Sequence, residues 1–130
     1  MKTTKQFILL FNAALFSLTG SAQTFDRVSE NAEATFYVNK STLNRNGKIA
    51  DFWQVIDYKN QMTDRQGKKY GSMEMHMVID CEAYSQTLIY MKVYSGNIAR
   101  GTLIASGSMK QSNSIPIGST LEAVRNYVCR

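Results

Sequence analysis

The chain has 130 residues, of which 44% are hydrophobic and 11% aromatic, and it carries a formal net charge of +5. This length is enough for one domain with one hydrophobic core. The basic excess is small and spread along the chain, which argues against a nucleic-acid-binding protein. Beyond the N-terminus, no apolar run is long enough to span a bilayer.

The first 22 residues have the pattern of a secretory signal peptide. Lys2 and Lys5 give a positive start, residues 7–18 are mostly apolar, and residues 20–22 are small. This apolar run is shorter than the about 20 residues that span a bilayer. We therefore expect cleavage after Ala22, with residues 23–130 exported as a single domain to the periplasm, the cell surface or the medium. No cysteine stands directly after the apolar run, where a lipid-anchored protein carries one, so we expect no lipid anchor.

The exported part contains two cysteines, Cys81 and Cys129. Export places them in an oxidising compartment, where an even number of cysteines favours a disulfide. The alternative is a redox or metal site, but the sequence has no Cys-x-x-Cys motif. A Cys81–Cys129 bridge would close a loop of about 49 residues and contribute roughly 4 kcal/mol in the chain-entropy account.

The first half of the domain predicts strands and hairpins. Residues 23–33 are polar and form a loose lead-in, whereas residues 34–38 are β-branched and aromatic, as in a strand. Asn46-Gly47 is a strong hairpin signal. It is followed by a predicted long strand at residues 49–58, which contains the single Trp, and by an exposed polar loop at residues 59–70.

The second half begins with the clearest strand signal in the chain. Residues 72–81 alternate strictly, as in a half-buried antiparallel strand. One face would carry Met73, Met75, Met77 and Ile79, and the other Ser72, Glu74, His76, Val78 and Asp80. Residues 87–94 predict another strand, with Ile89, Met91 and Val93 on one face. Residues 101–106 predict a short strand and residues 110–114 a polar loop.

The last element has helical features. Ser119-Thr120-Leu121-Glu122 is a capping box, in which Ser119 and Glu122 satisfy each other's free backbone donors. Leu121, Val124 and Val128 form one apolar stripe at helical spacing. This stripe must bury against the sheet, and the predicted disulfide would hold the helix there. The residues thus predict an α+β, mostly β fold with one C-terminal helix disulfide-linked to the sheet.

Short motifs in this order resemble the surface-adhesin protein E family of Gram-negative bacteria, over residues 36–130. They are Val55-Ile56-Asp57-Tyr58, Tyr70-Gly71-Ser72, Asp80-Cys81, Tyr94-Ser95-Gly96, Gly101-Thr102, Pro116-Ile117-Gly118-Ser119 and Tyr127-Val128-Cys129. The resemblance implies an antiparallel sheet of about six strands with the helix held by the disulfide. It also implies a surface role, since the name-giving members bind host extracellular-matrix proteins and epithelial cells, and pairing of copies through their sheets.

Two chemical alternatives centre on His76, the single histidine. Glu74 and Asp80 would share its strand face and allow acid–base chemistry, but no nucleophile motif accompanies them. Met73, Met75 and Met77, with His76 and Trp53, are ligand types that suit Cu(I). The methionines, however, point to the opposite strand face and are typical of core filling. We therefore expect no catalytic residues, no metal and no cofactor.

Basic residues in two loops suggest a binding surface. The first hairpin carries Arg45 and Lys48, and the 59–70 loop carries Arg65, Lys68, Lys69 and Tyr70. If both loops emerge at one end of the sheet, they form a basic, partly aromatic patch for an acidic protein or sulfated glycan. Without that convergence, these charges simply solubilise the loops. Open sheet edges would also allow a homodimer.

Together these patterns predict an exported, non-catalytic binding protein, adhesin-like, that recognises an extracellular host protein or an acidic glycan. Two other classes fit a small, disulfide-closed, β-rich exported domain. One is a periplasmic inhibitor or immunity protein that blocks a lysozyme or a toxin. The other is a structural component of the envelope.

Overall fold

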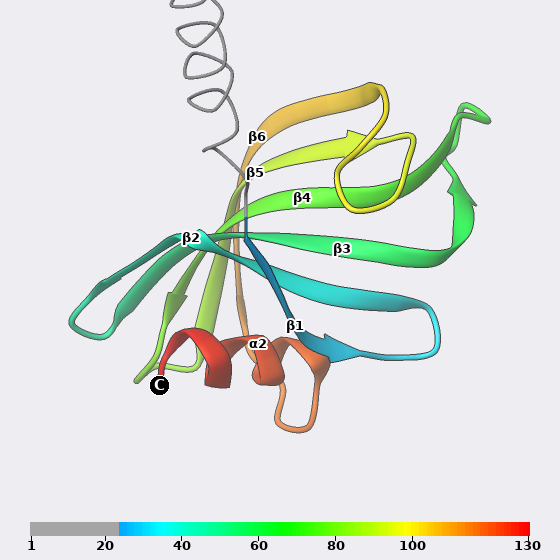
Figure 1. Cartoon of the computed structure of the whole chain (residues 1–130). Helices are drawn as coiled ribbons and strands as arrows, with labels where there is room; N and C mark the ends of the chain where they lie inside the picture. Colours follow the sequence, from blue (N-terminus) through cyan, green and yellow to red (C-terminus); the bar gives the residue numbers. More distant parts are fainter. Residues whose placement is uncertain (1–23) are drawn as a thin grey trace, which may run out of the picture.

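The structure is a computed structural model that describes residues 24–130, so the predicted signal peptide lies outside the described residues. Its six strands form one antiparallel sheet in chain order, β1-β2-β3-β4-β5-β6 (Figure 1). The strands are β1 Phe25–Glu30, β2 Ala34–Asn46, β3 Ile49–Thr63, β4 Lys69–Asp80, β5 Ser85–Tyr94 and β6 Leu103–Ser114. One helix, α2 Thr120–Val128, follows. The predicted α+β architecture is confirmed.

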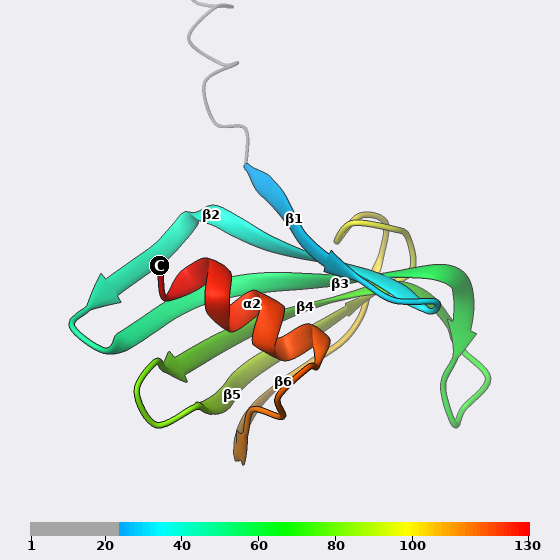
Figure 2. The same cartoon turned by 90° about the horizontal axis from the view of Figure 1, so that it is seen from below.

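Helix α2 lies on one face of the sheet, which we call the inner face (Figure 2). It contacts β1 and β2. Its Tyr127 hydroxyl donates a hydrogen bond to Asp26 of β1. Val124 and Val128 are buried in the same cluster as Val38. The remaining buried members of the cluster are Ala50, Phe52, Met75, Met77, Ile79, Cys81 and Ile115. The side of β4 predicted from its alternation therefore faces the core.

The outermost strands differ from the sequence prediction. Residues 25–30 form β1 and not a loose lead-in, and β6 continues through the predicted polar loop to Ser114. Edge strands pair on one side only, and almost every residue of β6 is exposed. The apolar pattern of β6 is therefore weak, and β1 gives little pattern because only Val28 among its six residues packs against the core cluster. The loop predicted at residues 59–70 also shrinks, since β3 runs to Thr63 and β4 starts at Lys69.

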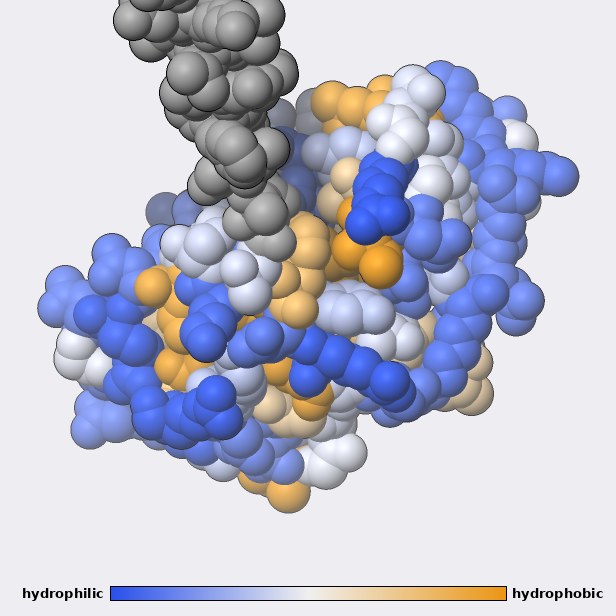
Figure 3. Space-filling model, in the orientation of Figure 1, coloured by the Kyte–Doolittle hydropathy of each residue, from blue (hydrophilic) through white to orange (hydrophobic). Residues whose placement is uncertain are grey.

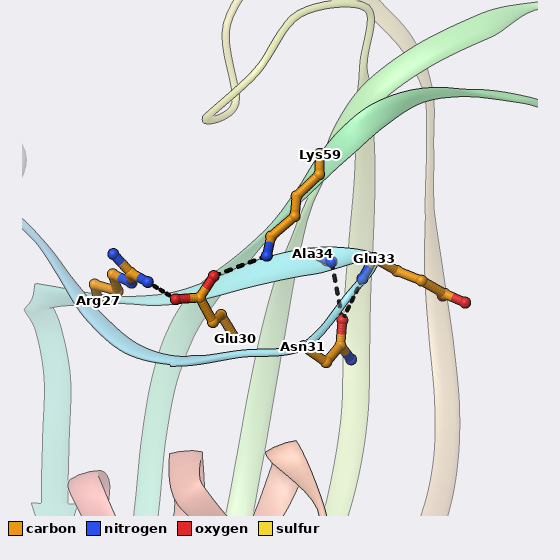
Figure 4. Close-up of polar contacts among 6 residues, drawn as sticks. All are labelled: Arg27, Glu30, Asn31, Glu33, Ala34 and Lys59. Carbon is orange, nitrogen blue, oxygen red and sulfur yellow. Dashed lines mark hydrogen bonds and ion pairs between the residues drawn. The ribbon is translucent and has the colours of Figure 1, made fainter.

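The turn between β1 and β2 shows how this edge is attached (Figure 4). The Asn31 side-chain oxygen accepts hydrogen bonds from the backbone N–H groups of Glu33 and Ala34, both at 2.9 Å. Glu30 pairs with Arg27 and, at 2.8 Å, with Lys59 of β3. Exposed ion pairs of this kind contribute about 0–1 kcal/mol each. The Asn31 turn therefore fixes the hairpin, and the charges only support it.

Strand β5 carries an irregularity that the alternation rule missed. His76 pairs with Tyr90 and Met77 with Leu88, so Ile89 has no partner on β4. Leu88 and Met91 both pack against the core cluster although they are three residues apart. The predicted face of Ile89, Met91 and Val93 is therefore wrong at its first position. A bulge shifts the alternation by one residue, which local sequence does not reveal.

The C-terminal prediction is confirmed with one change of partner. Cys81 and Cys129 are joined, with a Cα–Cα distance of 5.8 Å. The Ser119 hydroxyl accepts a hydrogen bond from the Glu122 N–H at 3.1 Å, as expected of an N-cap. The Glu122 carboxylate accepts from the Gly118 N–H at 2.9 Å and not from Ser119. Arg125 adds a hydrogen bond of 2.6 Å to the Cys81 carbonyl.

Candidate binding site on the outer face

The two basic loops of the predicted patch lie at opposite ends of β3. Asn46 pairs with Ile49 at one end, and Thr63 with Lys69 at the other. Two consecutive antiparallel hairpins that share a strand must emerge at its two ends. A single patch of Arg45, Lys48, Arg65, Lys68, Lys69 and Tyr70 therefore does not form.

The first hairpin uses its basic residues mainly for internal contacts. Arg45 donates hydrogen bonds to the carbonyl of Val128, at 3.1 Å, and to that of Gly47, at 2.7 Å. A cation at the C-terminus of a helix is favourable, because the last carbonyls carry partial negative charge. The ammonium of Lys48 lies 3.8 Å from the carboxylate of Asp80. Arg45 therefore ties this hairpin to α2.

The second hairpin exposes its basic side chains to solvent. Arg65, Lys68 and Lys69 are exposed. The Asp64 carboxylate holds the turn by accepting from the Lys68 N–H at 2.8 Å. Tyr70 is half-buried, with its ring 5.7 Å from that of Tyr58 in an edge arrangement. This basic hairpin, residues 63–70, is the part of the predicted patch that remains.

The loop between β5 and β6, residues 95–102, folds back over the outer face, which is the face opposite α2 (yellow in Figure 1). Asp57 of β3 accepts hydrogen bonds from the Asn97 side chain, at 2.9 Å, and from the Ile98 N–H, at 2.8 Å. Ser72 of β4 is fully buried. Its hydroxyl donates to the Gly96 carbonyl at 2.6 Å and accepts from the Ala99 N–H at 2.9 Å. Two side chains of the sheet thus anchor the loop.

The loop lies so close to the sheet that glycine is needed at the contact. A Cβ on Gly71 would come within 2.9 Å of the backbone carbonyl of Gly96, a distance that real side chains essentially never adopt. Within the loop, Ile98 and Ala99 have φ values of 52° and 53°. This left-handed conformation costs roughly 1–2 kcal/mol per non-glycine residue. The anchors at Asp57 and Ser72 therefore offset local backbone strain.

Beside the loop, aromatic side chains from three strands meet on the outer face. Trp53 of β3 stacks on His76 of β4, with ring centroids 5.2 Å apart and planes 15° apart. The ring of Tyr90 meets Trp53 edge-on at 6.3 Å. The ammonium of Lys92 lies 4.9 Å from the Trp53 centroid, within the range of a cation–π contact. Asp51 holds the His76 ring through a 2.7 Å contact to Nε2.

A hollow of about 410 Å³ opens between this aromatic row and the loop. Its lining residues are Asn39, Thr42, Trp53, Glu74, Lys92, Tyr94 and Ala99. Glu74 is 8% exposed, and its carboxylate is 3.8 Å from the ammonium of Lys92. Burial, and then the charge of Glu74, raise the pKa of the Tyr94 hydroxyl above its ordinary value of 10.0. The hollow therefore offers a ring surface, a carboxylate, an ammonium and neutral hydrogen-bonding groups together.

The viewed side of the molecule has a mixed surface. Hydrophobic patches are exposed near the middle of this side, and hydrophilic residues surround them (Figure 3). Apolar atoms form a large part of the surface of any folded protein, so this mixture by itself does not mark a binding site.

Sequence reasoning found only part of this site. It named Trp53, Glu74 and His76, but as candidates for metal or acid–base chemistry. It did not single out Lys92 or Tyr94. The available signal was the presence of large aromatic residues at the outward positions of predicted strands, where small polar residues are expected.

The copper alternative does not match the geometry. Met75 and Met77 belong to the inner core, whereas His76 stacks on Trp53 on the outer face. Among residues 24–130, no group of three or more His, Cys, Asp or Glu side chains is placed to hold a metal ion. In the same residues, no helix is long and apolar enough to cross a membrane.

The fold is similar to solved structures of Haemophilus influenzae protein E. One has a TM-score of 0.65 at 17% identity, with 85% of this chain and 87% of that chain covered. The selenomethionine form has a TM-score of 0.65 at 16% identity, covering 85% and 89%, respectively. Crystal form II has a TM-score of 0.62 at 13% identity, covering 84% and 96%. At these identities the likeness shows a shared fold.

No curated protein matches the sequence significantly. The sequence model of the family described as surface-adhesin protein E matches residues 25–130. This range contains all six strands, the 95–102 loop, the disulfide and α2. The chain therefore belongs to the surface-adhesin protein E family, which implies an exported, adhesin-like protein.

Proposed function

We propose that this protein is a non-catalytic adhesin that recognises an extracellular host protein or glycan through its outer face, and that an acidic glycan fits the site best. The observation that carries this proposal is the hollow beside Trp53, with Glu74 and Lys92 in its lining. The face of an indole ring packs against the apolar face of a sugar ring. Carboxylates and amides bind sugar hydroxyls, and Lys92 binds a sulfate or carboxylate.

The basic hairpin supports an acidic partner for a separate reason. Arg65, Lys68 and Lys69 are exposed within five residues of one another. Charge clustered in this way raises the rate of encounter with an oppositely charged partner and makes it depend on salt. In this proposal the hairpin attracts the glycan, and the hollow supplies the specific contacts.

The test is binding to an immobilised sulfated glycan such as heparin, measured at low and at physiological salt. Lys92→Ala should weaken binding roughly tenfold to a hundredfold, because it removes a charge-assisted hydrogen bond worth about 1.5–3 kcal/mol. Lys110→Ala removes the same charge from an exposed position on β6 and serves as the matched control. Equal affinities of Lys92→Ala and Lys110→Ala would contradict the role of the hollow.

The hairpin is tested by the double change Lys68→Glu and Lys69→Glu. Its control is Lys40→Glu with Lys110→Glu, which changes the net charge equally at exposed positions away from the hairpin. We expect the hairpin variant to lose association rate at low salt and the control to lose much less. If both variants lose association rate equally, the effect comes from the overall charge of the protein and not from the hairpin.

The signal peptide and the location are part of the proposal. Cleavage after Ala22 and exposure on intact cells, detected by surface labelling and fractionation, are the expected results. Confinement of the protein to the periplasm would favour the inhibitor, immunity or envelope alternatives over adhesion.

A further inference from the structure

A second cavity lies on the inner face beside α2, away from the proposed glycan site. Its volume is about 230 Å³. Its apolar walls come from strands β2 to β5 and from the first turn of α2, namely Phe36, Ile56, Met75, Met77, Leu88 and Leu121. Figure 2 shows α2 crossing the sheet, with parts of β4 and β5 beside the helix.

Two side-chain amide oxygens in the lining of this cavity are buried and accept no hydrogen bond from the protein. Gln54 is 3% exposed, and its Oε1 accepts no hydrogen bond. The Oε1 of Gln86 is buried and unpaired as well. In the described residues, only one other buried side-chain atom, Nε of Arg125, is in this state. A buried acceptor without a partner lowers the stability of the fold by about 1–3 kcal/mol. A ligand that donates a hydrogen bond to one of these oxygens would recover part of that free energy.

Gln54 is a polar residue at a core-facing position of β3. Gln54 stands between Phe52 and Ile56 on the core-facing side of β3, where the alternation calls for apolar side chains. A polar residue that breaks the pattern without an internal partner is the kind of local inconsistency that marks functional sites. The walls next to it include Met75 and Met77, whose flexible side chains adapt to ligands of varied shape.

We propose that this cavity binds a compact, uncharged ligand with an apolar ring or short chain and one or two N–H or O–H donors. The apolar walls take the body of the ligand, and its first donor bonds to the buried amide oxygen of Gln54; the Gln86 oxygen is available to a second donor. The lining contains no charged side chain. A charged ligand would therefore lose its hydration without gaining a partner. This site is independent of the glycan proposal, because the two cavities open on opposite faces of the sheet.

Indole and indene are suitable probes, because they have nearly the same shape and differ in the N–H donor. Binding to the disulfide-bonded exported protein is followed through the methyl NMR signals of the labelled methionines. We expect indole to shift the signals of Met75 and Met77 in a saturable way and to leave that of the exposed Met109 unchanged. We expect indole to bind roughly tenfold more tightly than indene, although indene is the more hydrophobic probe.

Gln54→Leu tests the donor partner directly. This change should abolish or reverse the preference for indole, whereas Gln111→Leu, at an exposed rim position, should keep it. If Gln54→Leu does not fold, the indole–indene comparison in the unaltered protein still decides the question. Absence of saturable shifts at Met75 and Met77, equal affinity for both probes, or an unchanged preference in folded Gln54→Leu would each overturn the proposal.

Discussion

Ser72 offers a sharp test of how the outer face is built. Its side chain is fully buried, and its hydroxyl makes two hydrogen bonds to the 95–102 loop. Ser72→Ala removes both and leaves the Gly96 carbonyl and the Ala99 N–H without these partners. An unpaired buried group costs about 1–3 kcal/mol, and these two groups are half-buried, so water compensates part of the loss. We expect the free energy of unfolding to fall by about 2 kcal/mol.

The measurement is urea-induced unfolding with the disulfide intact. With a slope of about 1–3 kcal/mol per M for a domain of this size, the midpoint should fall by roughly 1 M. The matched control is Ser112→Ala on β6, which removes an exposed hydroxyl bonded to Thr87. This control should change stability by less than about 0.5 kcal/mol.

Loop opening gives a second, local readout of Ser72→Ala. Amide hydrogen exchange at Ile98 and Ala99 should accelerate more than exchange in the centre of β4, because both residues lose the anchor that offsets their strained φ values. Glycan binding should weaken as well, since Ala99 lines the hollow. The reasoning is refuted if Ser72→Ala and Ser112→Ala have the same stability and the same exchange rates.

Three further predictions concern the disulfide, acid stability and self-association. Replacing Cys81 and Cys129 by Ser should lower the free energy of unfolding by about 2–5 kcal/mol, measured by urea unfolding, and should free the C-terminus of α2 for exchange. Hydrogen bonds from the Ala83 N–H, more than any other cause, lower the pKa of Asp80. The stability linked to Asp80 is therefore present above its unfolded pKa of about 4 and lost as pH falls through its lower folded pKa. Asp80→Asn should flatten the acid limb of a stability–pH profile, and an unchanged limb would exclude this linkage. The polar edge strand β6 should allow a homodimer, visible as a concentration-dependent mass in light scattering, and a constant monomer mass would exclude it.

Sequence patterns predicted those elements whose apolar residues recur at the spacing of the element's buried side. Strand β4 is central and half-buried, so its period of two was clear. Helix α2 has both a cap and an apolar stripe. Strands β1 and β6 form the edges of the sheet: the sequence showed no strand pattern for β1 and predicted only the beginning of β6, at residues 101–106. The bulge at Ile89 was also invisible, because it depends on how β5 pairs with β4.

The site was harder to predict because it depends on strand order and register. Knowing that β2, β3 and β4 are neighbours suffices to separate the two basic hairpins, but this order came only with the structure. Lys92 of β5 reaches Trp53 of β3 across the intervening strand β4. The loop anchor joins Asp57 to Ile98, which are 41 residues apart in the chain. No motif of local sequence contains these pairs.

The motifs that carry the family resemblance explain how the 95–102 loop is held on the sheet, but they do not explain which ligand the site binds. Asp57, Ser72 and Gly96 belong to three such motifs, and all of them hold the 95–102 loop on the sheet. Glu74 and Lys92 lie outside those motifs, yet they supply the charged groups of the hollow. A chain that keeps these anchors but changes Glu74 and Lys92 would have the same loop position and different charges in the hollow. Exchanging Glu74 and Lys92 should therefore alter which glycan binds, whereas the amide-exchange rates of Ile98 and Ala99 should match those of the unaltered protein.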